Sequence, residues 1–264
     1  MKRTMVFVTL MTAIASLLYL GGHLYASEVD DNIVKAAKQS YVFKHYLKDD
    51  NVDVKSNNGE VTLTGTVSDD ASRALARETV ASLPGVKSVD NKLNIKGTPP
   101  EAHSDAWLIT KVKTTLLFHR NVSGAKTEVL ASNGTITLRG EAVNSAQRDL
   151  ASEYAQDVDG VKNVKNEMTV QGTPVKPGEA TMGEKLDAVG DLIDDASVTA
   201  LVKITLLYHR STSALNTTVS TKGGVVTLGG EAKSDSEKFL ATKLANDVHG
   251  VKQVVNNMTV LGAN

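Results

Sequence analysis

The chain has no cysteine among its 264 residues. Disulfide bonds and zinc sites built on thiolates are therefore excluded, and so is an N-terminal lipid attached through a cysteine. An excess of charge of one sign is also missing, since 29 Lys and Arg stand against 30 Asp and Glu. Domains that bind nucleic acids are strongly basic as a rule, so we expect no nucleic-acid partner.

The longest apolar run lies at the N-terminus. Lys2 and Arg3 precede an apolar stretch over residues 5–20, and small residues follow up to Ala26. A basic start, an apolar centre and a small-residue end are the parts of a secretory signal peptide. We therefore expect residues 1–26 to be removed after export. A retained membrane anchor is the alternative, although the stretch is short for a span of about twenty residues.

One pattern of about seventy residues is written three times in the chain. Its second and third copies align without a gap at an offset of ninety residues, and its first and second copies align at an offset of seventy-five. Paired glycines, twenty residues apart, mark each copy: Gly65 and Gly85, Gly140 and Gly160, and Gly230 and Gly250. We define unit 1 as residues 28–97, unit 2 as residues 103–172 and unit 3 as residues 192–262, with a linker over residues 173–191.

Each unit is predicted to begin with an amphipathic helix and a β-hairpin. Apolar residues recur every four positions along the helix: Ile33, Ala37 and Tyr41; Leu108, Val112 and Leu116; Val198, Val202 and Leu206. Two segments of alternating polarity follow, as in half-buried strands. The pairs between them, Asn58-Gly59, Asn133-Gly134 and Gly223-Gly224, accept the positive φ angles of a type I′ turn.

A second helix and a last strand complete each unit. The helix is predicted to begin after the capping residues Asp69, Asn144 and Ser234, and to stop at the later glycine of each pair. A right-handed crossover returns the last strand to the sheet of the hairpin. The predicted fold class is α+β, with three tandem α-β-β-α-β units, each a three-stranded mixed sheet with two helices on one face.

Three features are similar to those of a known domain family: the glycine after each second strand, the GVK segments at residues 85–87, 160–162 and 250–252, and the run at residues 194–200. With them the chain resembles the BON (bacterial OsmY and nodulation) family. This resemblance implies a periplasmic location, association with phospholipid membranes and a part in osmotic or envelope stress. It implies no catalytic activity and no cofactor.

The sequence itself also argues against catalysis. It contains no GxSxG nucleophile motif and no GxGxxG or GxxxxGK[ST] phosphate loop. The carboxylate pairs Asp49-Asp50 and Asp69-Asp70 occur in unit 1 only, whereas chemistry built into a repeated unit should recur. No histidine or carboxylate lies at metal-ligand spacing from the helix-end histidines. We predict that the protein is not an enzyme and binds neither cofactor nor metal.

Cations recur at the end of each first helix, as His119-Arg120, His209-Arg210 and, in unit 1, Lys44-His45. They are either a patch for an anionic surface or cations that stabilise a helix C-terminus by about 0.3–1 kcal/mol. Trp107, the one tryptophan, either lies at a membrane interface or packs against a neighbouring unit. The candidate lipid-binding residues are Lys203, His209, Arg210, Lys111, Lys113, His119, Arg120 and Trp107.

Asparagine recurs in the last strand, at Asn91, Asn166 and Asn256. We expect these side chains to bind the backbone at a bend rather than a ligand.

Two functions remain from the sequence. The first is a non-catalytic periplasmic protein that binds phospholipid surfaces, best through unit 3, where 7 cations exceed 5 anions. The alternative is a periplasmic chaperone or adaptor whose clients are exported proteins.

Overall fold

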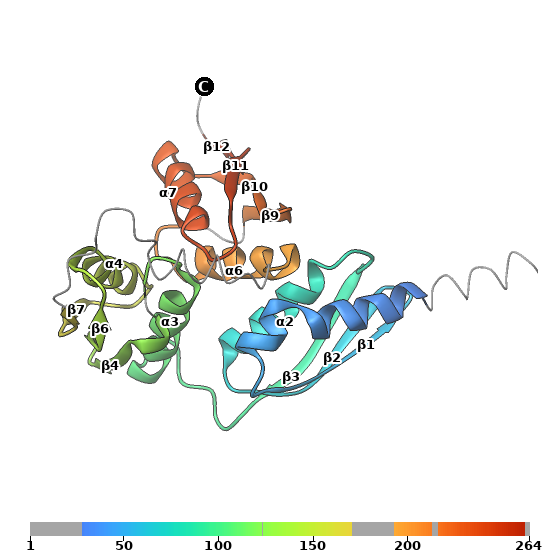
Figure 1. The fold of residues 1–264 in the computed structure, drawn as a ribbon, viewed down its shortest axis with the longest axis horizontal. Coiled ribbons are helices and arrows are strands. Elements are labelled where there is room, and N and C mark those ends of the chain that lie inside the picture. Colours follow the sequence, from blue (N-terminus) through green and yellow to red (C-terminus); the bar gives the residue numbers. More distant parts are fainter. Residues whose placement is uncertain (1–27, 123, 171–192, 213–215, 262–264) are drawn as a thin grey trace, which may run out of the picture.

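The structure is a computed structural model that describes residues 28–122, 124–170, 193–212 and 216–261. The expected signal peptide at residues 1–26 and the predicted linker at residues 173–191 lie outside the described residues. Within them, the three units are α+β lobes that pack around one helix of unit 3 (Figure 1).

Unit 1 shows the predicted order of elements. A helix over residues 28–39 runs into a π-helical turn, η1 (Val42–Tyr46), and is followed by β1 (Asn51–Asn57), β2 (Glu60–Val67), α2 (Asp70–Ala81) and β3 (Ser88–Ile95). The sheet order is β1-β2-β3, in which β1 and β2 are antiparallel whereas β2 and β3 are parallel. Both helices lie on the same face of this mixed sheet (Figure 1).

Units 2 and 3 repeat this plan with interrupted strands. Unit 2 contains α3 (Asp105–Phe118), η2 (Gly124–Lys126), β4 (Glu128–Ser132), β5 (Thr135–Arg139), β6 (Glu141–Ala142), α4 (Ser145–Gln156), β7 (Asn163–Asn166) and β8 (Thr169–Val170). Unit 3 contains α6 (Asp195–Tyr208), β9 (Thr217–Lys222), β10 (Val225–Ala232), α7 (Asp235–Asn246), β11 (Gln253–Asn256) and β12 (Thr259–Val260). The predicted fold class is confirmed in all three units.

The repeated glycine after the second strand permits a close backbone approach. Gly140 has a φ of +129°, and a Cβ atom there would lie 2.5 Å from the carbonyl oxygen of Lys126. Any other residue would have to push away the end of η2, just before β4. The spacing of glycines in the sequence therefore reflects the hairpin geometry.

The predicted hairpin turns are confirmed, and each is held by an aspartate of the first helix. Asn133 and Gly134 have φ angles of 52° and 82°, as a type I′ turn requires. Their N–H groups donate to the Asp105 carboxylate over 2.8 and 2.9 Å. These bonds favour the charged form and lower the pKa of Asp105. Asp30 and Asp195 accept the equivalent turn N–H groups in units 1 and 3.

The second helices begin where predicted, because Asp69, Asn144 and Ser234 each accept the N–H of the third following residue. One core prediction is wrong. Tyr41 is only half-buried, and the residue fully removed from solvent is Val42, at 0% exposure. The π-helical turn that starts at Val42 moves the apolar position along by one residue.

Units 1 and 3 share one continuous hydrophobic core, while unit 2 has its own. The amino end of α6 receives the first helix of unit 1: Asp194 accepts the N–H of Tyr41 over 2.7 Å and Ser197 accepts that of Val42 over 3.0 Å. Helix α6 also contacts α2 and α3, so it lies where all three units meet (Figure 1).

Candidate functional site at the junction of units 2 and 3

Units 2 and 3 bind each other through equivalent residues. His119 forms an antiparallel bridge with Val248, and Val158 forms one with His209. His119 and His209 are equivalent residues ninety positions apart, and so are Val158 and Val248. The two bridges thus join the same pair of equivalent positions in opposite directions. The contact therefore has approximate two-fold symmetry. We name it the 2–3 junction, formed by the ends of α3 and α4 and the ends of α6 and α7.

Backbone hydrogen bonds follow the same symmetry. The Arg120 N–H donates to the Asp247 carbonyl over 3.0 Å, and the Arg210 N–H donates to the Asp157 carbonyl over 2.9 Å. A second pair joins the His249 N–H to the Phe118 carbonyl and the Asp159 N–H to the Tyr208 carbonyl, over 3.1 and 3.3 Å. Each first helix is thus tied to the end of the other unit's second helix.

The two arginine side chains close those helix ends. The Arg120 guanidinium donates to three carbonyl groups at and just after the end of α7, those of Asn246, Val248 and Val251. Arg210 donates to the equivalent groups after α4, those of Gln156, Val158 and Val161. A cation is favoured where the last carbonyl groups of a helix point outward. The predicted helix-end cations therefore serve helix ends, but in the neighbouring unit.

Unit 1 lacks the groups that this contact needs. Lys44-His45 replaces the His-Arg pair, and Pro84 stands where Asp159 and His249 donate their N–H groups. Proline has no N–H to donate. The sequence of unit 1 thus removes one of the junction's hydrogen bonds, which explains why units 2 and 3 pair with each other.

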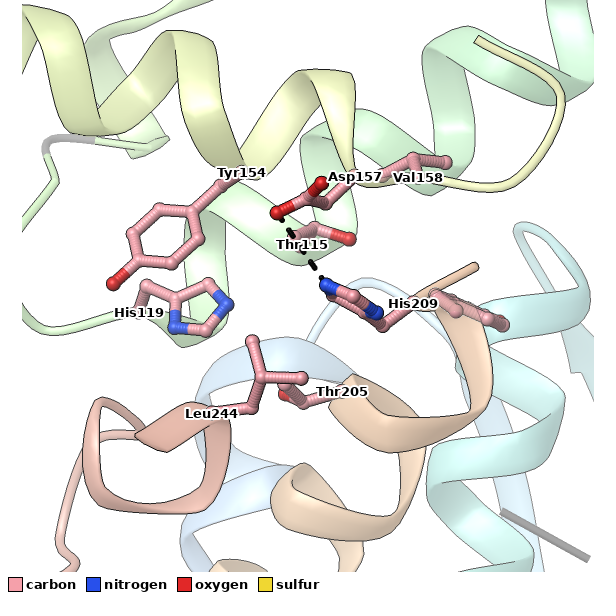
Figure 2. Close-up of a pocket in the computed structure, with 9 residues that line it drawn as sticks. Thr115, His119, Tyr154, Asp157, Val158, Thr205, His209 and Leu244 are labelled. Carbon is pink, nitrogen blue, oxygen red and sulfur yellow. Dashed lines mark ion pairs between the residues drawn. The ribbon is translucent and has the colours of Figure 1, made fainter. Parts of the chain in front are cut away.

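A small cavity lies at the centre of the junction (Figure 2). The cavity has a volume of about 10 Å³, which is room for about one water molecule. Its lining residues are Thr115, His119, Tyr154, Asp157, Val158, Thr205, Tyr208, His209 and Leu244. Buried side-chain atoms without a hydrogen-bond partner lie on Thr115, Thr205, Tyr208 and both histidines.

The two histidines differ in their surroundings. His209 Nδ1 accepts the Ser211 N–H over 3.0 Å, and Nε2 faces the Asp157 carboxylate at 3.4 Å (Figure 2). This contact lowers the pKa of Asp157. His119 instead lies flat against the Tyr154 ring, with centroids 3.8 Å apart, and the Tyr154 hydroxyl donates to Asp247 over 2.8 Å. Burial lowers the pKa of His119 to about 3.

Two of the candidate lysines lie in contacts with unit 1. Lys111, only 4% exposed, places its Nζ 3.6 Å from Asp70 of unit 1 and 3.8 Å from the ring centroid of Tyr208 in unit 3. Burial lowers the pKa of Lys111, and Asp70 opposes that effect. Lys203 forms a 2.9 Å ion pair with Glu78 of unit 1.

The other two candidates lie in unit 2. Lys113 is exposed. Trp107 is half-buried, packs against the core of unit 2 and lies 5.2 Å from Lys111 Nζ. The structure therefore gathers six of the eight candidates, all except Lys113 and Trp107, into contacts between units.

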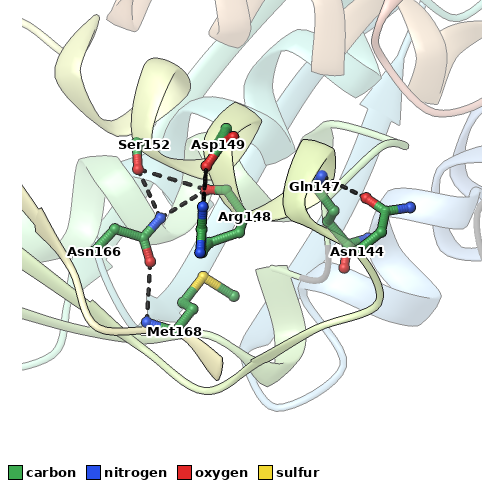
Figure 3. A network of polar contacts seen from close by, with 7 residues as sticks. All are labelled: Asn144, Gln147, Arg148, Asp149, Ser152, Asn166 and Met168. Atoms are coloured by element: carbon green, nitrogen blue, oxygen red, sulfur yellow. Dashed lines mark hydrogen bonds and ion pairs between the residues drawn. The ribbon is translucent and has the colours of Figure 1, made fainter. Parts of the chain in front are cut away.

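The recurring asparagines bind the backbone, as expected. The amide nitrogen of Asn166 donates to the Arg148 carbonyl and the Ser152 hydroxyl, and its oxygen accepts the Met168 N–H over 3.0 Å (Figure 3). Asn91 and Asn256 bind their second helices in the same way. In units 2 and 3 they join the bend between the last two strands to the second helix, and in unit 1 Asn91 joins the continuous β3 to α2.

The remaining surface holds one large exposed aromatic that the sequence prediction missed. Phe239, on α7, is 73% exposed. Ala74 and Asp149 stand at the equivalent positions of the other units, so a comparison of the three copies would have singled it out.

Among the described residues no group of three or more His, Asp or Glu is arranged to hold a metal ion, and no described helix is long and apolar enough to cross a membrane.

A family model named BON domain matches residues 29–97, 104–172 and 194–262. The chain belongs to the BON family. Its three BON domains correspond to the three units and cover most of the sequence.

Two curated relatives align with about half of this chain. Osmotically-inducible protein Y of Escherichia coli is 30% identical over 145 residues, which are 53% of this chain and 72% of the relative. Outer membrane lipoprotein DolP of Haemophilus influenzae is 28% identical over 142 residues, 52% of this chain and 73% of the relative. Among solved structures, CdsD of the Chlamydia trachomatis Type III secretion system aligns with 83% of this chain and 90% of its own at 17% identity, with a TM-score of 0.23.

Proposed function

We propose that this BON protein is a non-catalytic protein of the periplasm that binds phospholipid surfaces through unit 3 and serves in osmotic or envelope stress. The names of the two relatives, one osmotically inducible and one an outer membrane lipoprotein, support this role. The chain has no cysteine to carry a lipid. We therefore assign membrane binding to side chains of the folded units.

The observation that carries the proposal is the exposure of Phe239. An aromatic ring that is 73% exposed gains free energy when a partner covers it, about 1.5–3 kcal/mol for full burial. Lys243 follows four residues later, on the same face of α7, and is also exposed. An apolar side chain beside a cation fits the boundary between anionic headgroups and acyl chains. Each lysine near such a surface adds about 1 kcal/mol.

Co-sedimentation with phosphatidylglycerol and phosphatidylcholine vesicles, at low and high salt, tests the proposal. We expect binding to phosphatidylglycerol that weakens with salt, and a loss of about tenfold or more in partitioning for Phe239→Ala. Leu207→Ala is the matched control, because Leu207 is another exposed apolar residue of unit 3, at 48% exposure on α6.

The charge is tested separately. Lys243→Glu should weaken binding to phosphatidylglycerol by about tenfold, whereas Lys165→Glu, an exposed lysine of unit 2, should have little effect. The proposal fails when no vesicles bind at low salt. It also fails when Leu207→Ala reduces binding as much as Phe239→Ala does.

The adaptor role rests on one other observation. Strand β3 runs over eight residues and pairs along one side with β2, while its other side has no strand partner among the described residues. An exposed edge of this kind can accept an extended segment of another protein. Light scattering by a denatured exported protein tests it: undiminished aggregation at equimolar BON protein would exclude a chaperone role.

A further inference from the structure

The 2–3 junction buries a histidine that has nowhere to place a positive charge. His119 is 0% exposed, and neither ring nitrogen makes a hydrogen bond of good geometry to a described residue. The backbone of Asp247 favours the charged ring, but burial outweighs it. One face of the ring is covered by Tyr154, whose plane is tilted from it by only 2°. A charged imidazolium in this position would lose its hydration and gain no counter-ion in return.

We propose that the 2–3 junction is an acid-opened latch, in which protonation of His119 separates unit 2 from unit 3. The two antiparallel bridges and the two arginine caps are the contacts that it releases. The latch does not depend on the proposed membrane role, because it is a property of the protein without lipid.

The charged and titratable groups around His119 do not offer it a counter-ion. From α4 come Tyr154 and Asp157, from α6 come Tyr208 and His209, from the end of α7 come Asp247 and His249, and the flanking cations are Arg120 and Arg210. The Asp157 carboxylate faces His209, and the Asp247 carboxylate accepts the Tyr154 hydroxyl. Both carboxylates of the junction are thus engaged elsewhere.

The direction of the pH effect follows from burial. The pKa of His119 falls from an ordinary 6.5 to about 3, chiefly because of burial, with nearby His249 and His209 adding to the shift and the backbone of Asp247 opposing it. A group whose pKa is lowered in the closed form stabilises that form above its open-state pKa. The closed junction is therefore fully stable above about pH 6.5 and weakens as the pH falls toward 3.

His209 has a different role, although it occupies the equivalent position. Its Nε2 lies 3.4 Å from Asp157, so a protonated His209 has a carboxylate to pair with inside the closed junction. Acid opening is therefore assigned to His119 alone. This asymmetry supplies a control: the same substitution at the two positions should give different results.

Hydrogen exchange of the junction amides measures the opening. Between the two pKa values the ratio of open to closed molecules rises tenfold per pH unit, so it should be about 30-fold higher at pH 5 than at neutral pH. We expect the protection factors of the Arg120, Arg210 and His249 amides to fall by that factor. The Lys162 and Lys252 amides, bonded within their own units to Gly134 and Gly224, should remain protected.

Substitutions assign the effect. His119→Gln cannot be protonated and should make the protection factors of the junction amides independent of pH between 7 and 5. His209→Gln should retain most of the 30-fold change. The latch is disproved if the wild-type junction amides change less than threefold, or if His119→Gln retains the full change.

A measurement on the wild-type protein keeps the proposal testable if the 2–3 junction does not form in the His119→Gln variant. The Cε1 proton of His119, followed by NMR, should titrate well below an ordinary 6.5, because most molecules at pH 5 still hold the ring neutral in the closed junction. Titration of His119 near pH 6.5 in a molecule whose junction amides stay protected would contradict the proposal.

Discussion

Arg120 and Arg210 stand ninety residues apart at equivalent positions, and each guanidinium binds the carbonyl groups that end the other unit's second helix. The pair makes the contact between units 2 and 3 reciprocal. Each unit supplies one arginine and one helix end to the contact. A substitution on either side therefore leaves half of the contact in place.

Arg120→Met should loosen the 2–3 junction while preserving the apolar stem of the side chain. Hydrogen bonds from a charged donor contribute about 1.5–3 kcal/mol, so we expect a loss of that size, read as a fall in the protection of the His249 amide. Arg139→Met is the control, because its ion pair with Glu167 is half-exposed and exposed pairs contribute about 0–1 kcal/mol. Equal effects of the two substitutions would refute the capping role.

Local features of the fold were predictable from the sequence because they depend on neighbouring residues. The Asn133-Gly134 turn needs two positive φ angles, and the cap at Asn144 needs one side-chain oxygen before a helix. The helix-end cations show what local sequence cannot predict. The macrodipole argument says that Arg120 favours a helix C-terminus, but it does not say which one.

Contacts between units also account for what the sequence did not show. Val42 replaces Tyr41 in the core because the end of this helix is received by Asp194 and Ser197 of unit 3. Lys111 lies next to the core residue Val112 and is buried only because units 1 and 3 close over it. The partner residues are more than eighty positions away or in another unit, and no local pattern encodes them.

Lys111 provides a test of a buried cation at the meeting point of the three units. Lys111→Met keeps the stem and removes both the charge and the cost of burying it, so we expect a stability change within about 1 kcal/mol. Lys111→Ala also leaves a cavity and should cost about 2–5 kcal/mol. Urea denaturation distinguishes them, with the exposed Lys113→Ala as a control expected within about 0.5 kcal/mol.

Asp105 makes the stability of unit 2 depend on acid. Its pKa is lowered because the backbone N–H groups of Gly134 and Asn133 bind the charged form. A carboxyl whose pKa is lowered in the folded state stabilises the fold above its unfolded pKa of 3.8, and that contribution is lost as the pH falls below it. Asp105→Asn should therefore be less stable than the wild type at pH 6.

The difference between Asp105→Asn and the wild type should disappear as the pH approaches 2. Urea midpoints measured from pH 6 to pH 2 give the comparison. Asp149→Asn is the control, because this carboxylate is 63% exposed and pairs only with its neighbour Arg148 among the described side chains. A constant difference between Asp105→Asn and the wild type at every pH would show that the charge is not responsible.

Asn166 should be the most sensitive residue on β7 of unit 2. Asn166→Ala removes both donors to α4 and the acceptor of the Met168 N–H (Figure 3). Leaving buried polar groups without partners costs about 1–3 kcal/mol. Asn163→Ala, on an exposed position of the same strand, should change the free energy of unfolding by about 0.5 kcal/mol or less. The equivalent Asn91→Ala should cost less than Asn166→Ala, because the bond from Asn91 to the Arg73 carbonyl is exposed to water. Urea denaturation that ranked Asn163→Ala with Asn166→Ala would mean that the strand, rather than its bond to the helix, determines stability here.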